Sequence, residues 1–427
     1  MTLHDGELVR IEKPVYGGDF LARVDGKAVF VPFVLPGEQA RIRITEDKRA
    51  FARGELESLA QAAPERIQPA CAHFGACGGC HYQHAPYGLQ LALKQTILRE
   101  TLSRAAVHAP AEIAVLAAEP WHYRNRIRLA FDAQGNPGYR GRRSHTVIAL
   151  HECPIAAPIL LRAAFDLQKI LPAFASGTRP SELTLFTNHD ESALLTSIVF
   201  PRAERISADD VFSALREPIP QLAGLELLAE TQRNQPPRRF SAASGQSLLY
   251  RTAGFDYRVD HGAFFQVNRR LVDALVECVC GNRTGRLAWD LYAGVGLFAQ
   301  PLAARFQRVA AVESSSFATA ALGHNLRGTS AAAESSDTLA FLRLNRNSPR
   351  PDLVVLDPPR TGLGAEITSL LAGIASPEIV YVSCDPATLA RDLRALLTGG
   401  YALESLTLAD LFPQTYHLET VAHLRRA

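Results

Sequence analysis

The stretch Leu287-Ala288-Trp289-Asp290-Leu291-Tyr292-Ala293-Gly294-Val295-Gly296 decides the fold of this 427-residue chain. An apolar run typical of a buried strand leads directly into a glycine loop, whose backbone can approach a ligand closely before the next helix begins. Three further apolar runs follow, with helical spacing between them, at residues 309–312, 352–356 and 379–382. This alternation predicts a doubly wound, Rossmann-like α/β sheet.

Polar residues follow these predicted strands, at the edge where open α/β sheets bind ligands. Glu313 comes 19 residues after Gly294 (313 − 294) and is placed to accept hydrogen bonds from ribose hydroxyls. The alternative role for Glu313 is to cap a helix N-terminus. Asp357-Pro358-Pro359-Arg360 ends another strand, and its two prolines fix a rigid extended loop that can present polar groups to a flat ring.

A lone cysteine follows the last apolar run, in Val382-Ser383-Cys384-Asp385-Pro386. At the carboxyl edge of a parallel sheet, its thiolate can add to an electron-poor carbon of a bound substrate. Free cysteine is also a common buried small hydrophobe. The polar neighbours Ser383 and Asp385 disfavour that interpretation, so Cys384 is predicted to be a nucleophile.

Seven cysteines are an odd number in a chain without a secretion signal, which argues against a disulfide framework. Four of them form a metal-ligand pattern, Cys71-x5-Cys77-x2-Cys80 with Cys153-Pro154 downstream, and nearby glycines allow the loop to wrap a compact core. Four thiolates fit either an iron-sulfur cluster or a structural zinc ion. Cys278 and Cys280 lie on an apolar helix face and are assigned to packing.

Three domains are predicted. Residues 1–60 alternate apolar and polar positions between glycine turns, which favours a small OB-like β-barrel that resembles an RNA-binding TRAM domain. Residues 61–240 form an α+β middle domain that carries the cysteine cluster and an amphipathic helix at 87–105. Residues 241–427 form the Rossmann-like domain.

Bulk charge does not identify the partner, since 45 Lys and Arg nearly balance 43 Asp and Glu. Arginine is instead interleaved with aromatic residues in two segments, which suggests RNA phosphate contacts by Arg124, Arg126, Arg128, Arg140 and Arg142. Solvated arginines on exposed strands would give the same pattern. No apolar run is long enough for a membrane span, so a cytoplasmic protein is expected.

Five stretches together resemble the RNA 5-methyluridine methyltransferase family over nearly the whole chain. They are Phe264-Phe265-Gln266-Val267-Asn268, Asp290-Leu291-Tyr292-Ala293-Gly294-Val295-Gly296, Asp357-Pro358-Pro359-Arg360-Thr361-Gly362, Ser383-Cys384-Asp385-Pro386-Ala387-Thr388-Leu389-Ala390-Arg391-Asp392 and His417-Leu418-Glu419-Thr420. That family uses S-adenosylmethionine, and its bacterial ribosomal-RNA members carry a TRAM domain and an iron-sulfur cluster.

The resemblance implies a role for each matched residue. Cys384 is the implied nucleophile and Glu419 the implied base that removes the C5 proton. The cofactor and base pocket is implied to be lined by Gln266, Tyr292, Gly294, Gly296, Glu313 and Asp357. A 4Fe-4S cluster is implied at Cys71, Cys77, Cys80 and Cys153, with zinc as the alternative.

The expected activity is therefore methylation of a uridine C5 in RNA, with 23S ribosomal RNA preferred over transfer RNA. Arg360 stands where amino-methyltransferases have a stacking aromatic residue and where 5-methylcytidine enzymes have a cysteine, which favours carbon methylation of uracil. A noncatalytic RNA-binding iron-sulfur protein is the alternative from another class. The protein is expected to act as a monomer.

Overall fold

The structure is a computed structural model that describes residues 6–174, 177–232 and 235–427. The N-terminal part is the predicted small barrel, and its five strands close in the order β1-β2-β3-β5-β4. These strands are β1 (Glu7–Pro14), β2 (Asp19–Val24), β3 (Lys27–Pro32), β4 (Gln39–Asp47) and β5 (Phe51–Gln61). Alternate residues such as Val9 and Ile11 point into its apolar core.

A long loop carries the first three cysteines to helix α1 (Tyr87–Arg104), in agreement with the amphipathic pattern. The middle of the chain then forms a seven-stranded sheet in the order β13-β12-β11-β10-β7-β8-β9. Its strands are β7 (Arg126–Phe131), β8 (Pro137–Arg140), β9 (Val147–Ala149), β10 (Glu182–Thr187), β11 (Leu194–Phe200), β12 (Leu222–Ala229) and β13 (Arg238–Ser244).

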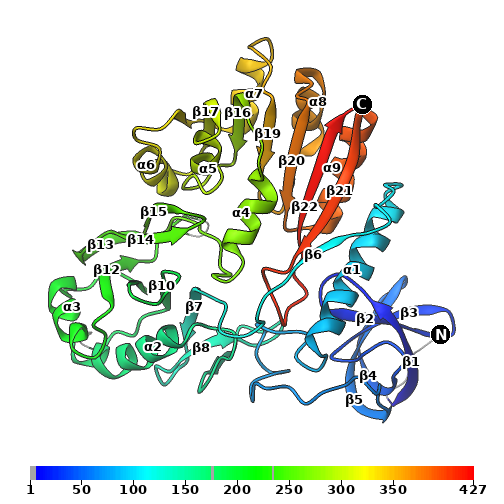
Figure 1. Cartoon of the computed structure of the whole chain (residues 1–427). Coiled ribbons are helices and arrows are strands. Elements are labelled where there is room, and N and C mark those ends of the chain that lie inside the picture. The colour runs from blue at the N-terminus through cyan, green and yellow to red at the C-terminus, as the bar shows by residue number, and fades with distance from the viewer. Residues whose placement is uncertain (1–5, 175–176, 233–234) are drawn as a thin grey trace.

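Helices cover one face of this middle sheet. Leu183, Leu185 and Leu227 share an apolar core with residues of the helices. The helices are α2 (Pro158–Ile170), the short 3-10 helix η1 (Leu171–Ala173) and α3 (Ala208–Arg216). A hairpin of β14 (Ser247–Thr252) and β15 (Phe255–Asp260) connects this sheet to the last part of the chain (Figure 1).

The C-terminal part is the predicted doubly wound sheet, with strand order β18-β17-β16-β19-β20-β22-β21-β6. The strands are β6 (Ala114–Leu116), β16 (Gly285–Leu291), β17 (Phe306–Glu313), β18 (Ala331–Ser335), β19 (Leu353–Leu356), β20 (Glu378–Ser383), β21 (Tyr401–Ala409) and β22 (Glu419–Arg426). The helices are α4 (Val272–Cys280), α5 (Ala299–Ala303), α6 (Ser316–Asn325), α7 (Thr338–Asn345), α8 (Gly364–Ile374) and α9 (Pro386–Thr398).

The sequence pattern does not predict two features of this sheet. The last strand, β22, runs antiparallel between β20 and β21. The short strand β6, from the segment after α1, pairs with β21 at the sheet edge, and α1 packs against α9. The N-terminal half of the chain is thereby fixed to the C-terminal sheet (Figure 1). In the described part of the chain no helix is long and apolar enough to cross a membrane.

A buried ion pair holds α1 to the segment that leads into β22. The Lys94 ammonium lies 2.5 Å from Asp410 Oδ1, and both side chains are fully buried. Lys94 also donates to the carbonyl oxygen of Phe412. Because both charges have left water, either one alone in this place would be strongly unfavourable.

Replacing Lys94 with methionine should lower the free energy of unfolding by about 3–5 kcal/mol, because it leaves the Asp410 carboxylate buried without its partner. Denaturant unfolding measures this change. The matched control is Lys13→Met, which breaks a partly exposed pair with Glu100 and should cost at most about 1 kcal/mol. Equal losses in the two variants would contradict the assignment of the Lys94 pair as a structural tie.

Candidate active site

Four parallel strands bring their carboxyl ends to one edge of the C-terminal sheet. Leu291 is the register partner of Val312 and of Leu356, and Leu356 is the partner of Tyr381. The residues that follow these positions therefore lie side by side. They include four of the predicted site residues, Tyr292, Glu313, Asp357 and Cys384.

Glu419 reaches the same edge from the opposite chain direction. Strand β22 begins at Glu419 and pairs antiparallel with β20, with Thr420 opposite Ser383. Cys384 follows Ser383 and Glu419 precedes Thr420, so the predicted nucleophile and the predicted base are neighbours on paired strands. The Glu419 side chain is buried.

The glycine loop after β16 adopts the backbone geometry that its glycines permit. Gly294 and Gly296 have φ of 57° and 93°, and Tyr292 also has a positive φ of 68°, which is uncommon for a bulky residue. The Glu313 carboxylate accepts from the backbone N–H of Gly294 at 2.8 Å and of Ser315 at 2.6 Å. Glu313 thus braces the loop and caps the following turn, and the free lone pairs of its oxygens stay available to ribose hydroxyls.

A cavity lies between this loop and the segment after β15. Gln266 lines it and its side-chain amide donates to Asp357 Oδ2 at 3.5 Å. Phe264 stands at its edge with 60% of its surface exposed. The lining residues are Phe264, Phe265, Gln266, Tyr292, Ala293, Gly294, Val295, Leu297, Phe298 and Asp357. The cavity joins aromatic faces to a few polar groups, as small-molecule sites do.

Buried carboxyl groups dominate the electrostatics of the sheet edge. Burial raises the pKa of Asp357 to about 7, and burial together with the Asp357 charge raises the pKa of Asp290 to about 8. The same two causes raise the pKa of Glu419 far above its usual range, and Arg360 opposes them. A cationic ligand would favour the ionised forms of these groups.

The Cys384 thiol shares this environment. Burial, followed by the Glu419 and Asp357 charges, raises the pKa of Cys384 to about 11, and Arg360 acts in the opposite direction. Without a ligand the thiol is therefore protonated at neutral pH. A positive charge near Asp357 and Glu419 would lower the Cys384 pKa and activate the thiolate.

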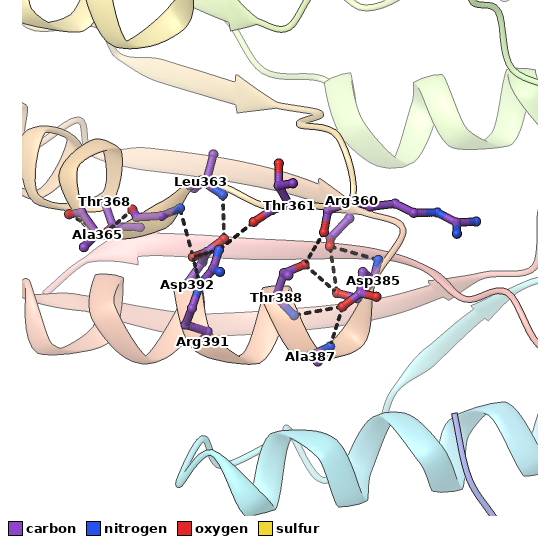
Figure 2. A network of polar contacts seen from close by, with 12 residues as sticks. Arg360, Thr361, Leu363, Ala365, Thr368, Asp385, Ala387, Thr388, Arg391 and Asp392 are labelled. Carbon is purple, nitrogen blue, oxygen red and sulfur yellow. Dashed lines mark hydrogen bonds and ion pairs between the residues drawn. The ribbon is translucent and has the colours of Figure 1, made fainter. Parts of the chain in front are cut away.

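A polar network holds the loops that carry Arg360 and Cys384 (Figure 2). Asp385 caps α9 by accepting from the backbone N–H groups of Ala387 and Thr388. The Thr388 hydroxyl donates to the Arg360 carbonyl oxygen at 3.2 Å. In Figure 2 the Arg360 side chain extends away from this network, and its guanidinium lies 3.2 Å from His417 Nδ1. The two loops are thus joined by the Thr388 side chain, which reaches the Arg360 backbone, and by the Asp385 side chain, which caps α9.

The buried Asp392 forms the second half of this network. Its carboxylate accepts from the Leu363 N–H at 2.7 Å and from the Tyr381 hydroxyl at 2.9 Å. Gly362 has a φ of 70°, and a Cβ at this position would lie 2.4 Å from Asp392 Oδ2. Glycine is therefore required where the loop after the two prolines turns over Asp392.

The N-terminal barrel also reaches the catalytic edge. Tyr16, in the turn between β1 and β2, donates through its hydroxyl to the carbonyl oxygen of Cys384 at 3.3 Å. Its ring packs edge-on against Tyr416, which in turn contacts His81 of the cysteine loop. The backbone N–H groups of His81 and Tyr82 donate to the Gln414 carbonyl oxygen. Three segments therefore meet beside Cys384. They are the N-terminal barrel, the cysteine loop and the segment before Glu419.

The four clustered cysteines, Cys71, Cys77, Cys80 and Cys153, line one pocket. All are free thiols, and burial raises the pKa of Cys80 to about 12 and of Cys153 to about 11. The Gly79 N–H donates to Cys77 Sγ at 3.4 Å, and the Arg124 guanidinium lines the same pocket. Among the described residues, no group of three or more His, Cys, Asp or Glu side chains is arranged to hold a metal ion.

The five predicted RNA-contacting arginines are not gathered on one surface. Arg124 is enclosed beside the cysteines, and Arg142 forms an ion pair with Asp19 of the barrel. Arg126 lies over the Phe186 ring at 4.0 Å, and Arg128 pairs with Glu182 at the sheet surface. Arg140 is exposed next to His145. Their RNA contacts stay predictions.

Three residues near the site were not predicted. Asp290 could have been found, since a carboxylate within an apolar strand is a signal of special use. From the sequence, Arg360 was used only to distinguish uracil methylation from other methylations and was given no role in the site. Arg360 is the cation that opposes the rise in the pKa values of Cys384 and Glu419. Tyr16 gives no local signal, because its contact with Cys384 spans 368 positions of the chain.

Comparisons with known proteins show the family of the chain. A family profile described as tRNA (uracil-5-)-methyltransferase matches residues 245–427, and a TRAM domain profile matches residues 7–56. An uncharacterized RNA methyltransferase of Streptomyces avermitilis is 32% identical over 98% of this chain and 98% of its own length. A 23S rRNA (uracil(1939)-C(5))-methyltransferase RlmD of Halomonas elongata is 32% identical over 97% of this chain and 88% of its own length.

Among solved structures, the tRNA (uracil-54, C5)-methyltransferase of Pyrococcus abyssi in complex with S-adenosyl-L-homocysteine aligns with a TM-score of 0.79. The alignment covers 98% of this chain and 100% of that one at 23% identity. It supports the same fold over the whole chain.

Alkylation of Cys384 should depend steeply on pH, because its raised pKa leaves little thiolate at neutrality. The rate with iodoacetamide, measured by peptide mass analysis, should rise about tenfold per pH unit from pH 7 to about 10. Arg360→Gln should slow it further, since the opposing positive charge is lost. The Cys384→Ser variant corrects for the other thiols. A rate that levels off below pH 8 would show that the thiol is already activated without a ligand.

Proposed function

Because the chain belongs to the RNA uracil-C5 methyltransferase family, we propose that it transfers a methyl group from S-adenosylmethionine to C5 of a uridine in 23S ribosomal RNA. One observation carries the proposal, namely the register that sets Cys384 and Glu419 side by side at the edge occupied by Asp357. Substitution at uracil C5 requires a nucleophile and a base that reach the same ring, and two adjacent side chains can do so.

The chemistry of uracil explains these residue types. C5 of the ring is a poor nucleophile until a thiolate adds to C6. When the Cys384 sulfur bonds to C6, the ring becomes an enolate whose C5 can attack an electrophilic methyl group. The uridine must leave its stack to expose C6 to the thiol. Gln266 and Phe264 line the cavity beside Asp357 and would hold the ring.

Glu419 completes the reaction. After methylation, C5 carries both a methyl group and a hydrogen, and removal of that proton allows the C6–sulfur bond to break. The proton passes to the Glu419 carboxylate, and the bond electrons return to the Cys384 sulfur. Glu419 must therefore be ionised when it acts, although burial favours its neutral form in the free protein.

The acidic sheet edge suits a cationic methyl donor. S-adenosylmethionine would supply the electrophilic methyl group on a positively charged sulfur. Tyr292 and Gly294, which line the cavity, would bind its adenosine and methionine parts together with Gly296 of the same loop, and Glu313 would bind the ribose. Asp290 is buried and Asp357 is half-buried, and a nearby cation would stabilise the ionised forms of both carboxyl groups. We infer that the positive charge of the donor favours ionisation of this cluster, and that the same charge acts directly on Cys384 to lower its pKa and offset the added carboxylate charges.

Ribosomal RNA is preferred over transfer RNA because relatives named as 23S rRNA methyltransferases match 95% or more of this chain. The fold neighbour that acts on tRNA is the reason to keep tRNA as the second candidate. Labelled S-adenosylmethionine offered with separate unmodified rRNA and tRNA pools, followed by nucleoside mass analysis, tests both. Label in 5-methyluridine of the rRNA pool is expected, and label confined to tRNA would overturn the choice of substrate.

We further propose that the three predicted domains have different functions in the reaction. Residues 1–60 and 61–240 would hold the RNA, and residues 241–427 would bind the donor and the target base. A monomer contains every residue assigned to the reaction. Work on ribosomal RNA implies a cytoplasmic enzyme.

The four clustered cysteines are proposed to hold a 4Fe-4S cluster. The four cysteines line one pocket, which supports a shared metal group. The family resemblance favours iron, and four thiolates would also suit tetrahedral zinc. The enclosed Arg124 guanidinium would balance the negative charge of four thiolates.

The metal proposal predicts that anaerobically purified protein contains about four iron and four sulfide per chain, with visible absorption from sulfur-to-iron charge transfer. Cys153→Ser should lose the iron and lower the melting temperature. Cys278→Ser is the matched control and should keep the iron, because Cys278 packs against the apolar core and is not part of the cysteine pocket. Native protein that contains zinc and no iron would contradict the 4Fe-4S proposal and support a structural zinc site.

Two substitutions separate the roles of the nucleophile and the base. Cys384→Ala should abolish turnover while leaving binding of S-adenosylmethionine within about threefold, since the methyl donor does not need the thiol. Glu419→Gln should methylate its RNA once and then accumulate a covalent, methylated adduct, because the C5 proton cannot leave. Denaturing gels and mass analysis detect the adduct. Its absence in a folded Glu419→Gln protein would remove Glu419 from the role of base.

A further inference from the structure

One face of the middle sheet is an open cleft that the reaction does not use. Helices α2 and α3 cover the opposite face. The open face looks toward the hairpin and α6 (Figure 1), and a cleft of ≈ 380 Å³ that is open to solvent lies along it. Sites for small ligands commonly have volumes of about 300–1,000 Å³.

Polar side chains form a row across this face. Arg128 is the register partner of Thr184, Thr184 of Ser197, and Ser197 of Glu226. Register partners on neighbouring strands point to the same side of a sheet. All four line the cleft.

The inner end of the row is a hydrogen-bonded chain of three buried side chains. Ser197 Oγ donates to Glu226 Oε1 at 2.7 Å and lies 3.1 Å from His261 Nδ1. Since the hydroxyl hydrogen goes to the carboxylate, His261 Nδ1 must carry a hydrogen and donate it to Ser197. The His261 and Glu226 side chains are only 5% and 9% exposed.

This arrangement leaves two acceptors without donors. With its hydrogen on Nδ1, neutral His261 has a lone pair at Nε2, and this buried atom has no partner among the described residues. Glu226 Oε2 likewise receives no hydrogen bond from the described residues, and it is open to solvent in the cleft. A buried acceptor such as His261 Nε2 is costly to leave without a donor, so the chain is suited to a ligand that supplies N–H groups.

The surroundings of the chain suit the other parts of a nucleotide. Phe317, at the start of α6, is 48% exposed and stands over Gly262 at the cleft wall. Arg126 donates to the Ala263 carbonyl oxygen at 2.7 Å, and its Nε has no partner among the described residues. An aromatic face stacks bases and an arginine attracts phosphate.

We propose that the cleft binds a second nucleotide of the RNA substrate, with a base that bears an exocyclic amine held by Glu226 and His261 and stacked on Phe317. Adenine, cytosine and guanine carry such an amine and uracil does not. A phosphate placed at this end of the cleft would be repelled by the Glu226 carboxylate, which lines it. The subsite would thus distinguish neighbouring bases from the target uridine.

The position of the cleft places this nucleotide close to the target. His261 and Gln266 are five residues apart on one segment, so their Cα atoms are at most about 18 Å apart. Gln266 lines the cavity beside Asp357, and His261 lines the cleft. The same short segment would therefore contact both bases. This inference rests on the proposed RNA substrate and refines it.

The test uses the full-length protein and the shortest 23S rRNA fragment that it binds. Each amine-bearing nucleotide near the target is replaced in turn by an amine-free analogue, namely inosine for guanosine, purine riboside for adenosine or uridine for cytidine. At one position the dissociation constant should rise about tenfold, because the site keeps unpaired acceptors. Glu226→Gln should weaken binding of the natural RNA to a similar degree and show little further loss with that analogue.

Glu182→Gln is the matched control, since Glu182 lines the outer part of the same cleft and pairs with Arg128. It should keep the full response to the analogue. Because the RNA replacements leave the protein unchanged, they stay informative even if Glu226→Gln is poorly folded.

The outcomes separate this subsite from the proposed activity. If the protein methylates the RNA but binds every amine-free analogue as tightly as the natural fragment, the subsite is overturned and the activity stands. An analogue effect that persists undiminished in folded Glu226→Gln also overturns it. If no RNA is methylated and binding still shows the Glu226-dependent amine effect, the subsite stands and the activity fails.

Discussion

The antiparallel pairing of β20 with β22 is the constraint on which the rest of the site depends. It places Ser383 opposite Thr420, so that Cys384 and Glu419 emerge together at the carboxyl edge of the sheet. The parallel strands β16, β17 and β19 bring the glycine loop, Glu313 and Asp357 to the same edge. The buried Lys94–Asp410 pair and the Tyr16 hydrogen bond then hold the neighbouring loops from the N-terminal side.

In the free protein, ionised carboxyl groups at this edge of the sheet are electrostatically unfavourable. Asp290 and Glu419 are buried, Asp357 is half-buried near them, and the pKa of each carboxyl group is raised. These groups favour folding least at high pH, where burial opposes their ionisation. A cationic donor would relieve that cost, so the same groups that weaken the free protein would favour the bound complex. Perturbed pKa values are common at catalytic sites for this reason.

The sequence was sufficient for elements whose signal is local. The strand and glycine loop at 285–296 and the strand before Cys384 have periodicity and turn chemistry that a short window contains. Glu419 was identified only through resemblance, because nothing local shows that the last strand inserts between β20 and β21. Arg124 shows the same limit, since a long-range bridge to Ala156 encloses it beside the cysteines. The contact of Tyr16 with Cys384 depends on docking of whole domains.

The most direct test of the account is to offer the protein S-adenosylmethionine and RNA in which uridine is replaced by 5-fluorouridine. Fluorine at C5 leaves Glu419 no proton to remove, so the RNA should remain bonded to the protein through Cys384 after methyl transfer. A denaturant-stable complex that maps to Cys384 and is absent from Cys384→Ala is the predicted result. Active protein that methylates normal RNA without forming this complex would contradict covalent catalysis by Cys384.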